Sequence, residues 1–196
     1  MAYALVPPMH APAPALGGAA LGEAALGEVV ALDDGTTVTI RPIELSDAYR
    51  LRRMFDRLSP ETVYHRFFAP LPGPRAKMLM HLATVDHDRR EALVAVHGTE
   101  VVGIAQYEGD TGDEAEVAVM VEDGWQDRGL GTELLVRLAR IGIRRGLGAF
   151  TAIVMGENSA AVRFLKRLSP ETAVRLERGE YVVYAPLRRP GRSATR

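Results

Sequence analysis

Between residues 36 and 187, hydrophobic and polar positions follow two periods, one typical of strands and the other of helices. Runs that alternate every second residue predict strands, and apolar residues three and four positions apart predict amphipathic helices. Ser46-Asp47 and Ser59-Pro60 are typical helix starts. This order predicts an α+β domain in which a mixed sheet carries helices on both faces. In chain order, the pattern predicts a strand over 36–42, helices beginning at 46 and 59, a helix over 76–84, strands over 92–96, 101–107 and 115–122, a helix over 131–145, a strand over 150–155, a helix over 158–168, and strands over 172–176 and 181–187.

Both ends of the chain differ from this region. Residues 1–30 are rich in Ala, Pro and Gly and almost free of aromatic residues. A segment of this composition cannot bury enough apolar surface to offset the entropy lost on ordering, so we expect a flexible extension. An arm that docks on a neighbouring subunit or another partner is the alternative. The Arg-rich residues 188–196 are expected to be a solvated basic tail.

Charge and cysteine content narrow the function classes. The chain has 24 Lys and Arg against 25 Asp and Glu, so no overall field draws it to nucleic acid or to a membrane surface. It has no Cys, which excludes disulfides, thiolate nucleophiles and zinc-thiolate sites. The five His residues lack metal-ligand spacing, so we expect no metal. With neither a recognisable signal peptide nor an apolar run near the roughly 20 residues of a membrane helix, a cytoplasmic location is expected.

The main functional signal lies in residues 114–132. A Val-rich strand leads into the loop Gln126-Asp127-Arg128-Gly129-Leu130-Gly131, and a helix follows at once. The first turn of a helix has backbone N–H groups without intrahelical partners and a positive dipole end, both of which suit a phosphate group. Glycines at 129 and 131 let the phosphate approach the backbone. The pattern Q-x-x-G-x-G is neither a P-loop nor a dinucleotide fingerprint, so it predicts a phosphate loop of another kind.

This loop and the strand before it resemble the acetyl-CoA pyrophosphate loop of the GNAT N-acetyltransferase superfamily. The element order over about residues 36–187 is also similar to the GNAT fold, whose central sheet is mostly antiparallel. The resemblance implies acetyl-CoA as co-substrate, no metal, and direct transfer of the acetyl group to an amine. It further implies that backbone groups of Val119 and Val121 contact pantetheine, and that the pyrophosphate is held by Gln126, Asp127, Arg128, Gly129, Leu130, Gly131 and Thr132.

Glu116 is the candidate general base. It lies on a strand of Ala and Val residues, where a carboxylate has no packing role. Partial desolvation at such a position would raise its pKa, and a base with a raised pKa could accept the proton of an amine acceptor. The alternative is a Glu that faces outward and forms an ion pair, because Glu114 and Glu122 show that this strand carries other carboxylates.

A narrower resemblance concerns the acceptor. Ala115-Glu116-Val117-Ala118-Val119, with Gln126 ten residues after the Glu, is similar to bacterial protein lysine acetyltransferases that regulate acetyl-CoA synthetase; residues 58–68 resemble the second helix of that group, which borders the acceptor groove. The resemblance implies a protein lysine acceptor and Glu116 as the base. An acetyltransferase for small amines and a non-catalytic acyl-CoA sensor are the alternatives, and a homodimer stays open.

The sequence departs from the family pattern near its C-terminal part. Asn158 matches a residue that contacts the cofactor in many GNAT enzymes, but it is equally well placed to cap the following helix. Leu165 stands where these enzymes often have a Tyr that protonates the leaving thiolate, so we assign no side-chain acid. Ser169-Pro170 replaces the usual Gly-Phe. Trp125 is expected to pack beside the loop or to contact the adenine or ribose.

Overall fold

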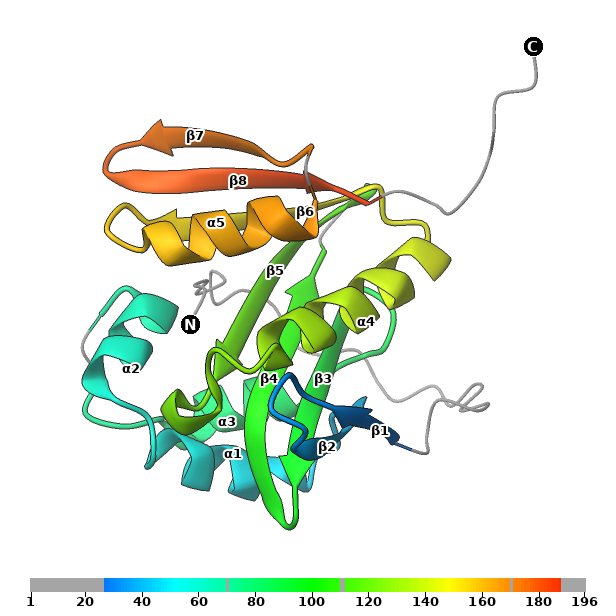
Figure 1. Cartoon of the computed structure of the whole chain (residues 1–196), viewed down its shortest axis with the longest axis vertical. Coiled ribbons are helices and arrows are strands. Elements are labelled where there is room, and N and C mark those ends of the chain that lie inside the picture. Colours follow the sequence, from blue (N-terminus) through cyan, green and yellow to red (C-terminus); the bar gives the residue numbers. More distant parts are fainter. Residues whose placement is uncertain (1–26, 70, 110–111, 170, 188–196) are drawn as a thin grey trace.

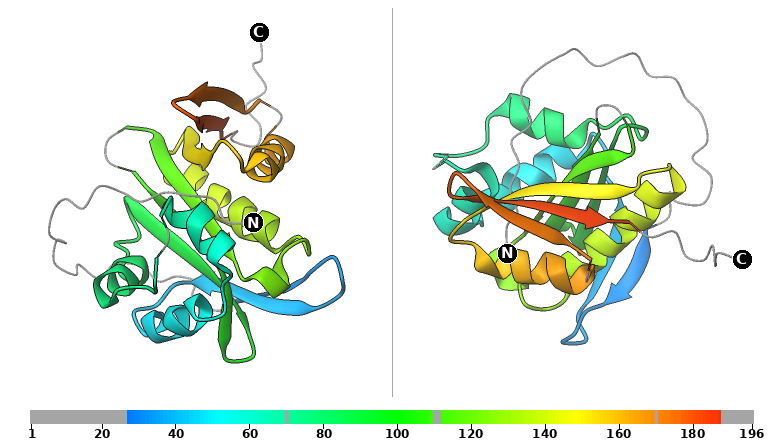
Figure 2. Two further views of the ribbon diagram at one scale, coloured as in Figure 1. Left: turned by 90° about the vertical axis from the view of Figure 1, so that its left-hand side faces the viewer. Right: turned by 90° about the horizontal axis from the view of Figure 1, so that it is seen from above.

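The computed structural model describes residues 27–187 except 70, 110, 111 and 170, and these residues form one eight-stranded sheet with helices on both faces (Figure 1). Helices α4 and α5 cover one face, and α1, α2 and α3 cover the other, as the right-hand view of Figure 2 shows. The predicted fold class is therefore confirmed. The strands are β1 (Glu28–Ala31), β2 (Thr37–Pro42), β3 (Arg90–His97), β4 (Glu100–Glu108), β5 (Glu114–Val121), β6 (Ala149–Met155), β7 (Ala173–Glu177) and β8 (Glu180–Pro186). The helices are α1 (Asp47–Phe55), α2 (Pro60–Phe67), α3 (Ala76–Ala83), α4 (Leu130–Arg144) and α5 (Ser159–Leu168), with a 3₁₀ turn η1 (Asp123–Trp125).

The sheet has the strand order β1-β2-β3-β4-β5-β6-β8-β7. All neighbouring strands are antiparallel except β5 and β6, which are parallel because α4 connects them across one face. Their pairing is short and runs from Glu114 opposite Ala149 to Glu116 opposite Thr151. Beyond this point β5 and β6 diverge (Figure 1). The sheet is thus opened at its centre.

Two apolar cores hold the layers together. On one face, α4 buries Leu134 and Leu138, which have no exposed surface, against β3, β4 and β5. On the other face, α1 buries Leu51 and Met54 against β4 in the same way. Burying one such side chain contributes about 1.5–3 kcal/mol. Both helices keep a helical apolar period in the sequence, which is why the pattern alone predicted them.

The N-terminal strand β1 was not predicted. Residues 28–30 were expected to belong to the flexible extension, but the structure pairs Glu28–Ala31 with β2 at the edge of the sheet. Val30 is buried there, and Arg137 of α4 donates to the carboxylate of Glu28 at 2.9 Å. Four residues are too few to show a period in a segment rich in Ala and Gly. The rest of the predicted extension, 1–26, and the predicted basic tail, 188–196, lie outside the described residues.

None of the helices in the described ranges is long and apolar enough to cross a membrane.

Candidate functional site

The opening between β5 and β6 leaves one edge of β5 without a strand partner beyond Glu116. The backbone N–H of Glu122 donates to a carbonyl of β4 at 3.0 Å. Because successive residues of a strand direct their backbone groups to opposite edges, those of Val121 and Val119 face away from β4 and toward the opening. The last β5–β6 pair joins Glu116 and Thr151, so both valines lie beyond the paired region. This edge can therefore form backbone hydrogen bonds with an extended amide such as pantetheine.

A cavity of about 330 Å³ lies at the N-terminus of α4. Gly129 caps this helix with φ 81°, a left-handed conformation that favours glycine. The N–H groups of the first helical turn lack intrahelical acceptors and lie at the positive end of the dipole. The cavity is thus chemically suited to a phosphate group. Six of the seven residues predicted to hold the pyrophosphate line it, namely Gln126, Asp127, Gly129, Leu130, Gly131 and Thr132.

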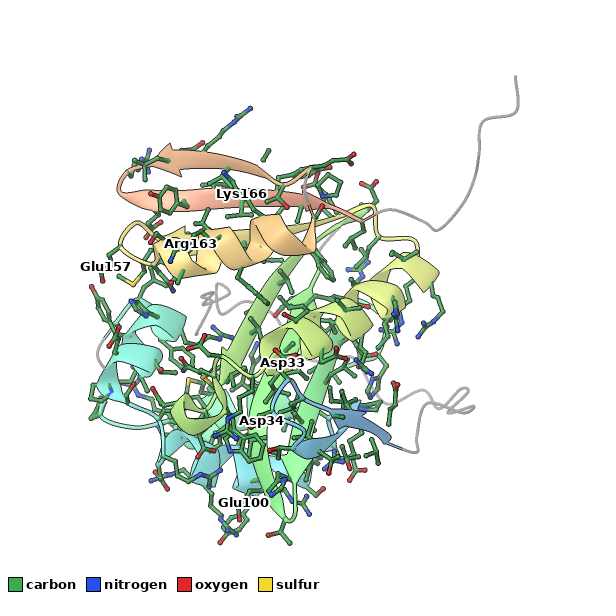
Figure 3. The ribbon with its side chains drawn as sticks, viewed as in Figure 1. Asp33, Asp34, Glu100, Glu157, Arg163 and Lys166 are labelled. Atoms are coloured by element: carbon green, nitrogen blue, oxygen red, sulfur yellow. The ribbon has the colours of Figure 1, made fainter. Side chains whose placement is uncertain are left out.

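Arg128 is the predicted loop residue that does not line this cavity. Its guanidinium pairs with Asp34 at 3.0 Å and lies 5.2 Å from the centre of the Trp125 ring. Asp33, next to Asp34 at the tip of the β1–β2 hairpin, does line the cavity, and both acids lie beside the start of α4 (Figure 3). Sequence reasoning missed Asp33 because the hairpin lies 94 residues before the loop that it contacts.

Gln126 connects the loop to the neighbouring strand and helix. Its Nε2 donates to the carbonyl of Val121 at 3.1 Å and to the hydroxyl of Thr62 on α2 at 3.2 Å. The Asp123 carboxylate accepts from Thr62 Oγ1 at 2.9 Å and from Ser59 Oγ at 2.7 Å. This network holds the N-terminus of α2 against the loop. It also leaves the Val121 N–H, rather than its carbonyl, as the group directed at the opening.

Glu116 lies on the face of β5 that α2 covers. It is half-buried, and its Oε1 is buried without a hydrogen-bond partner among the described residues. Desolvation by this burial raises the pKa of Glu116 to about 7, against a smaller opposing effect of the Arg66 guanidinium and with a further increase from Glu108. The carboxyl group can therefore exchange a proton near neutral pH.

Arg66 and Glu108 set the electrostatic environment of this carboxyl group. Arg66 of α2 is buried, its guanidinium lies 4.9 Å from the centre of the Phe67 ring, and desolvation lowers its pKa to about 10 despite the nearby Glu116. Glu108 of β4 is directly opposite Glu116, and Arg90 of β3 is directly opposite Glu108. The side chains of Arg90, Glu108 and Glu116 thus form a polar row across three strands, with Arg90 Nε 3.4 Å from Glu108 Oε2.

Asn158, which precedes α5, and Leu165 within it both have roles in the fold. Asn158 is buried, and its Oδ1 accepts from the backbone N–H of Ala161 at 3.1 Å, as expected of an N-cap. Leu165 is buried in the core on the α4 side of the sheet. Its hydrocarbon side chain can supply no proton. In the part of the chain that the structure describes, no three His, Asp or Glu side chains come together as metal ligands would.

A strand edge without a neighbouring strand, beside a helix N-terminus suited to a phosphate group, fits a nucleotide-linked thioester cofactor. Comparison with known proteins identifies it, because the model of the acetyltransferase (GNAT) family matches residues 48–169. An acetyltransferase of Pseudomonas aeruginosa is 32% identical over 137 residues, which are 67% of this chain and 74% of that protein. Acetyltransferase Pat of Mycolicibacterium smegmatis is 31% identical over 71% of this chain and 43% of its own length. The chain belongs to the GNAT family and is an N-acetyltransferase.

Solved structures agree with this assignment. The GNAT domain of S. lividans PAT superposes with a TM-score of 0.77 at 31% identity, over 82% of this chain and 97% of that domain. The yncA protein of Salmonella typhimurium, whose structure includes its cofactor acetyl-CoA, superposes with a TM-score of 0.61 over 82% of this chain and 99% of that one. At 20% identity, this second likeness shows the fold alone.

Proposed function

We propose that this chain transfers the acetyl group of acetyl-CoA to the side-chain amine of a protein lysine, with Glu116 as the general base. One observation carries the proposal: a half-buried carboxyl group with a pKa of about 7 lies at the last residue before β5 and β6 diverge. General bases are most effective when their pKa is close to the working pH.

The open edge of β5 would hold the cofactor. Val119 and the N–H of Val121 would bind the pantetheine amides, and the first turn of α4 would bind the pyrophosphate. The acetyl-CoA present in the related Salmonella structure supports acetyl-CoA as the co-substrate. With the pyrophosphate at Gly129–Gly131, the pantetheine arm would run along β5 toward Glu116. The thioester would then lie beside the carboxyl group.

The proposed reaction is a direct transfer. A lysine amine with a pKa near 10.4 is almost fully protonated at neutral pH, so Glu116 first takes its proton, directly or through a water. The neutral nitrogen then forms a bond to the thioester carbonyl carbon, the C–S bond breaks, and the nitrogen releases its second proton to solvent or to the leaving thiolate, which gives the neutral amide. Coenzyme A leaves as a thiolate or takes a proton from water, because Leu165 has none to give.

A protein acceptor is favoured by the likeness to Pat-type acetyltransferases. A small cationic amine is the second candidate, because Glu108 and Glu116 place two carboxylates side by side, and such a pair would attract a polyamine. A non-catalytic acyl-CoA sensor would bind the cofactor without turnover.

Coenzyme A release from acetyl-CoA tests these alternatives. The assay compares a purified acetyl-CoA synthetase, a polyamine set and no acceptor, using wild type, Glu116→Gln and Glu114→Gln. Glu114 is an exposed carboxylate two residues away on the same strand, which makes it the matched control. We expect release that depends on the synthetase, a loss of about 10²–10⁴-fold in Glu116→Gln, and near wild-type release in Glu114→Gln.

Other outcomes would change the assignment. Release with polyamines alone would replace the protein acceptor by a small amine. Equal losses in Glu116→Gln and Glu114→Gln would remove Glu116 as the base. Cofactor binding without turnover across a broad acceptor panel would support the sensor.

A further inference from the structure

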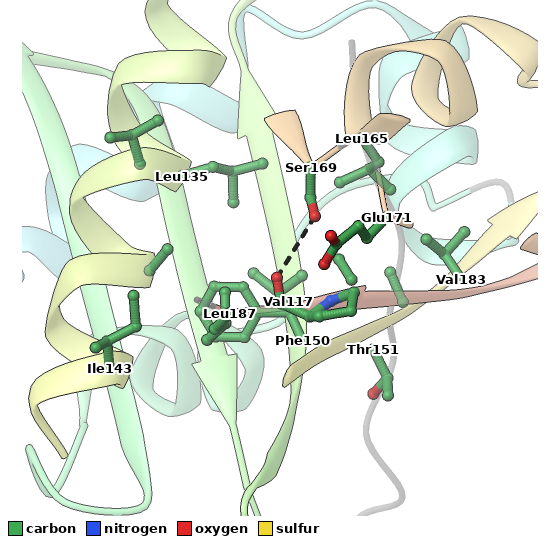
Figure 4. A pocket seen from close by; sticks show the side chains of 15 residues that line it. Val117, Leu135, Ile143, Phe150, Thr151, Leu165, Ser169, Glu171, Val183 and Leu187 are labelled. Carbon is green, nitrogen blue, oxygen red and sulfur yellow. Dashed lines mark hydrogen bonds between the residues drawn. The ribbon is translucent and has the colours of Figure 1, made fainter. Parts of the chain in front are cut away.

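A second cavity, of about 390 Å³, lies between α4, α5 and the strands β6 and β8, on the face of the sheet opposite Glu116 (Figure 4). Its walls are mainly hydrocarbon, with Leu135 and Ile143 from α4, Phe150 from β6 and Val183 from β8. Protein interiors are close-packed and hold few voids larger than a water molecule. The volume instead falls in the range of about 300–1,000 Å³ that is usual for small-molecule sites.

The cavity begins where β5 and β6 stop pairing. Val117 is the first residue of β5 beyond the last pair, and its side chain forms part of the wall. Leu165 of α5 forms another part. A Tyr at that position would place an aromatic ring and a hydroxyl where this chain has a smaller aliphatic side chain. Under the proposed function, the thioester lies in the gap between β5 and β6 at this point, so an acyl chain that turns away from Glu116 through the gap would enter the cavity.

We propose that this cavity binds the hydrocarbon part of acyl-CoA thioesters longer than acetyl, so that the chain accepts short and medium linear acyl groups. The proposal rests on the proposed function, because that function places the thioester at the mouth of the cavity. The transfer itself is unchanged: the amine nitrogen bonds to the acyl carbonyl carbon, the C–S bond breaks, and the thiolate leaves. The volume and the apolar wall both exceed what the single methyl group of acetyl needs.

The composition of the wall indicates which acyl chains the cavity would bind. Ser169 and Glu171, from the segment after α5, face into the cavity, and Ser169 Oγ donates to the carbonyl of Pro186 at 3.5 Å (Figure 4). Burying a charge against this mainly hydrocarbon wall is costly, so an acyl group that ends in a carboxylate, such as succinyl, would be disfavoured. Neutral chains are therefore expected to be favoured over acidic ones.

The test compares acetyl-, butanoyl-, hexanoyl- and succinyl-CoA, first by calorimetry without acceptor and then as substrates with an acceptor that takes acetyl groups. Each methylene buried in the cavity should tighten binding by up to about fourfold. A site sized for acetyl would instead lose about 10–200-fold per added methylene. We expect hexanoyl-CoA to bind more tightly than acetyl-CoA, and succinyl-CoA more weakly than butanoyl-CoA. If hexanoyl-CoA binds more weakly than acetyl-CoA, the proposal is overturned, even where the chain transfers acetyl groups. If no thioester is turned over, the proposed function is refuted, but the comparison of binding affinities still holds.

Two neighbouring substitutions on α4 separate this role from a loss of folding. Ala139 and Val136 both line the cavity. Ala139→Phe fills it and should lower the ratio of hexanoyl- to acetyl-CoA affinity about tenfold or more, whereas Val136→Ala widens it and should not lower that ratio. Arg140→Phe, at an exposed position of the same turn, should keep the wild-type ratio. Equal ratios in all three variants would overturn the proposal, because damage to α4 would affect both thioesters alike.

Discussion

Two carboxylates removed from bulk solvent, the buried Asp47 and the half-buried Glu116, have opposite surroundings. Asp47, at the start of α1, has no exposed surface and accepts four hydrogen bonds: two from Arg41 at 2.6 and 2.8 Å, one from Arg50 at 2.9 Å and one from the Glu44 N–H at 2.9 Å. These donors hold the pKa of Asp47 below its usual value although desolvation opposes them. Glu116 has an unpartnered oxygen among the described residues, and desolvation raises its pKa to about 7.

The difference shows what each carboxylate can do. A carboxylate satisfied on every side keeps its charge at all ordinary pH values, so it can stabilise the fold but cannot exchange protons. The arginines behave accordingly, because the pKa of Arg41 is raised by its hydrogen bonds to Asp47, whereas burial lowers that of Arg66 beside Glu116. The Asp47 cluster is built for stability, and the Glu116 site is left unsatisfied at the opening of the sheet. Substitution of Glu116 should therefore reduce activity, whereas substitution of Asp47 should reduce stability.

The largest effect is expected on catalysis. The ratio of wild-type to Glu116→Gln activity cancels the ionisation of the acceptor amine, so it reports the carboxyl group alone. Because the ionised form is the base and its pKa is about 7, the ratio should be about 10²–10⁴ at pH 8–9 and should fall roughly tenfold per unit below pH 7. Initial rates between pH 5 and 9 measure it. A ratio that does not change with pH would exclude proton transfer to Glu116.

The next effect is on stability. Asp47→Ala leaves Arg41 and Arg50 without their common partner. Because both arginines keep some contact with water, the free energy of unfolding should fall by about 2–4 kcal/mol. The melting temperature should fall by roughly 5–15 °C. The lowered pKa of Asp47 means that this stabilisation is present above the ordinary aspartate pKa and is lost as the pH falls through the lower folded value. The difference in the free energy of unfolding between wild type and Asp47→Ala should thus be constant from pH 5 to 8 and should become smaller in stronger acid.

Asp56→Ala is the matched control for this loss. Asp56 follows the same helix and pairs with Arg52 at 3.3 Å, with both side chains more than half exposed. An exposed pair contributes no more than about 1 kcal/mol. Chemical denaturation of both variants at pH 7 gives the comparison. Equal losses would mean that the burial of the Asp47 cluster adds nothing to stability.

The sequence predicted the elements better than the contacts that join them. The helical period of Leu134 and Leu138 and the alternation in β5 are local signals, so α4, β5 and the loop between them were found. The position of Glu116 on a Val-rich strand also signalled a special carboxylate. Asp47 was read only as a helix cap, because Arg41 lies on a separate strand whose approach depends on the whole fold. Asp33 was missed for the same reason, since its hairpin includes the unpredicted β1.

The smallest effect sharpens the contrast at Glu116 itself. Glu108 lies opposite Glu116 and, by its charge, raises the pKa of that carboxyl group; it also pairs with Arg90 and lies 3.7 Å from His81. Glu108→Gln removes a negative neighbour and releases these cationic partners, and both changes favour the ionised form of Glu116. The ratio to measure is the activity of Glu108→Gln divided by that of the double variant Glu108→Gln/Glu116→Gln. The pH below which this ratio falls should be lower by a fraction of a unit than the corresponding pH for wild type and Glu116→Gln. Activity at pH 8 should change little. An unchanged or higher midpoint, measured from rate profiles of Glu108→Gln with and without Glu116→Gln, would show that Glu108 does not raise the pKa of Glu116.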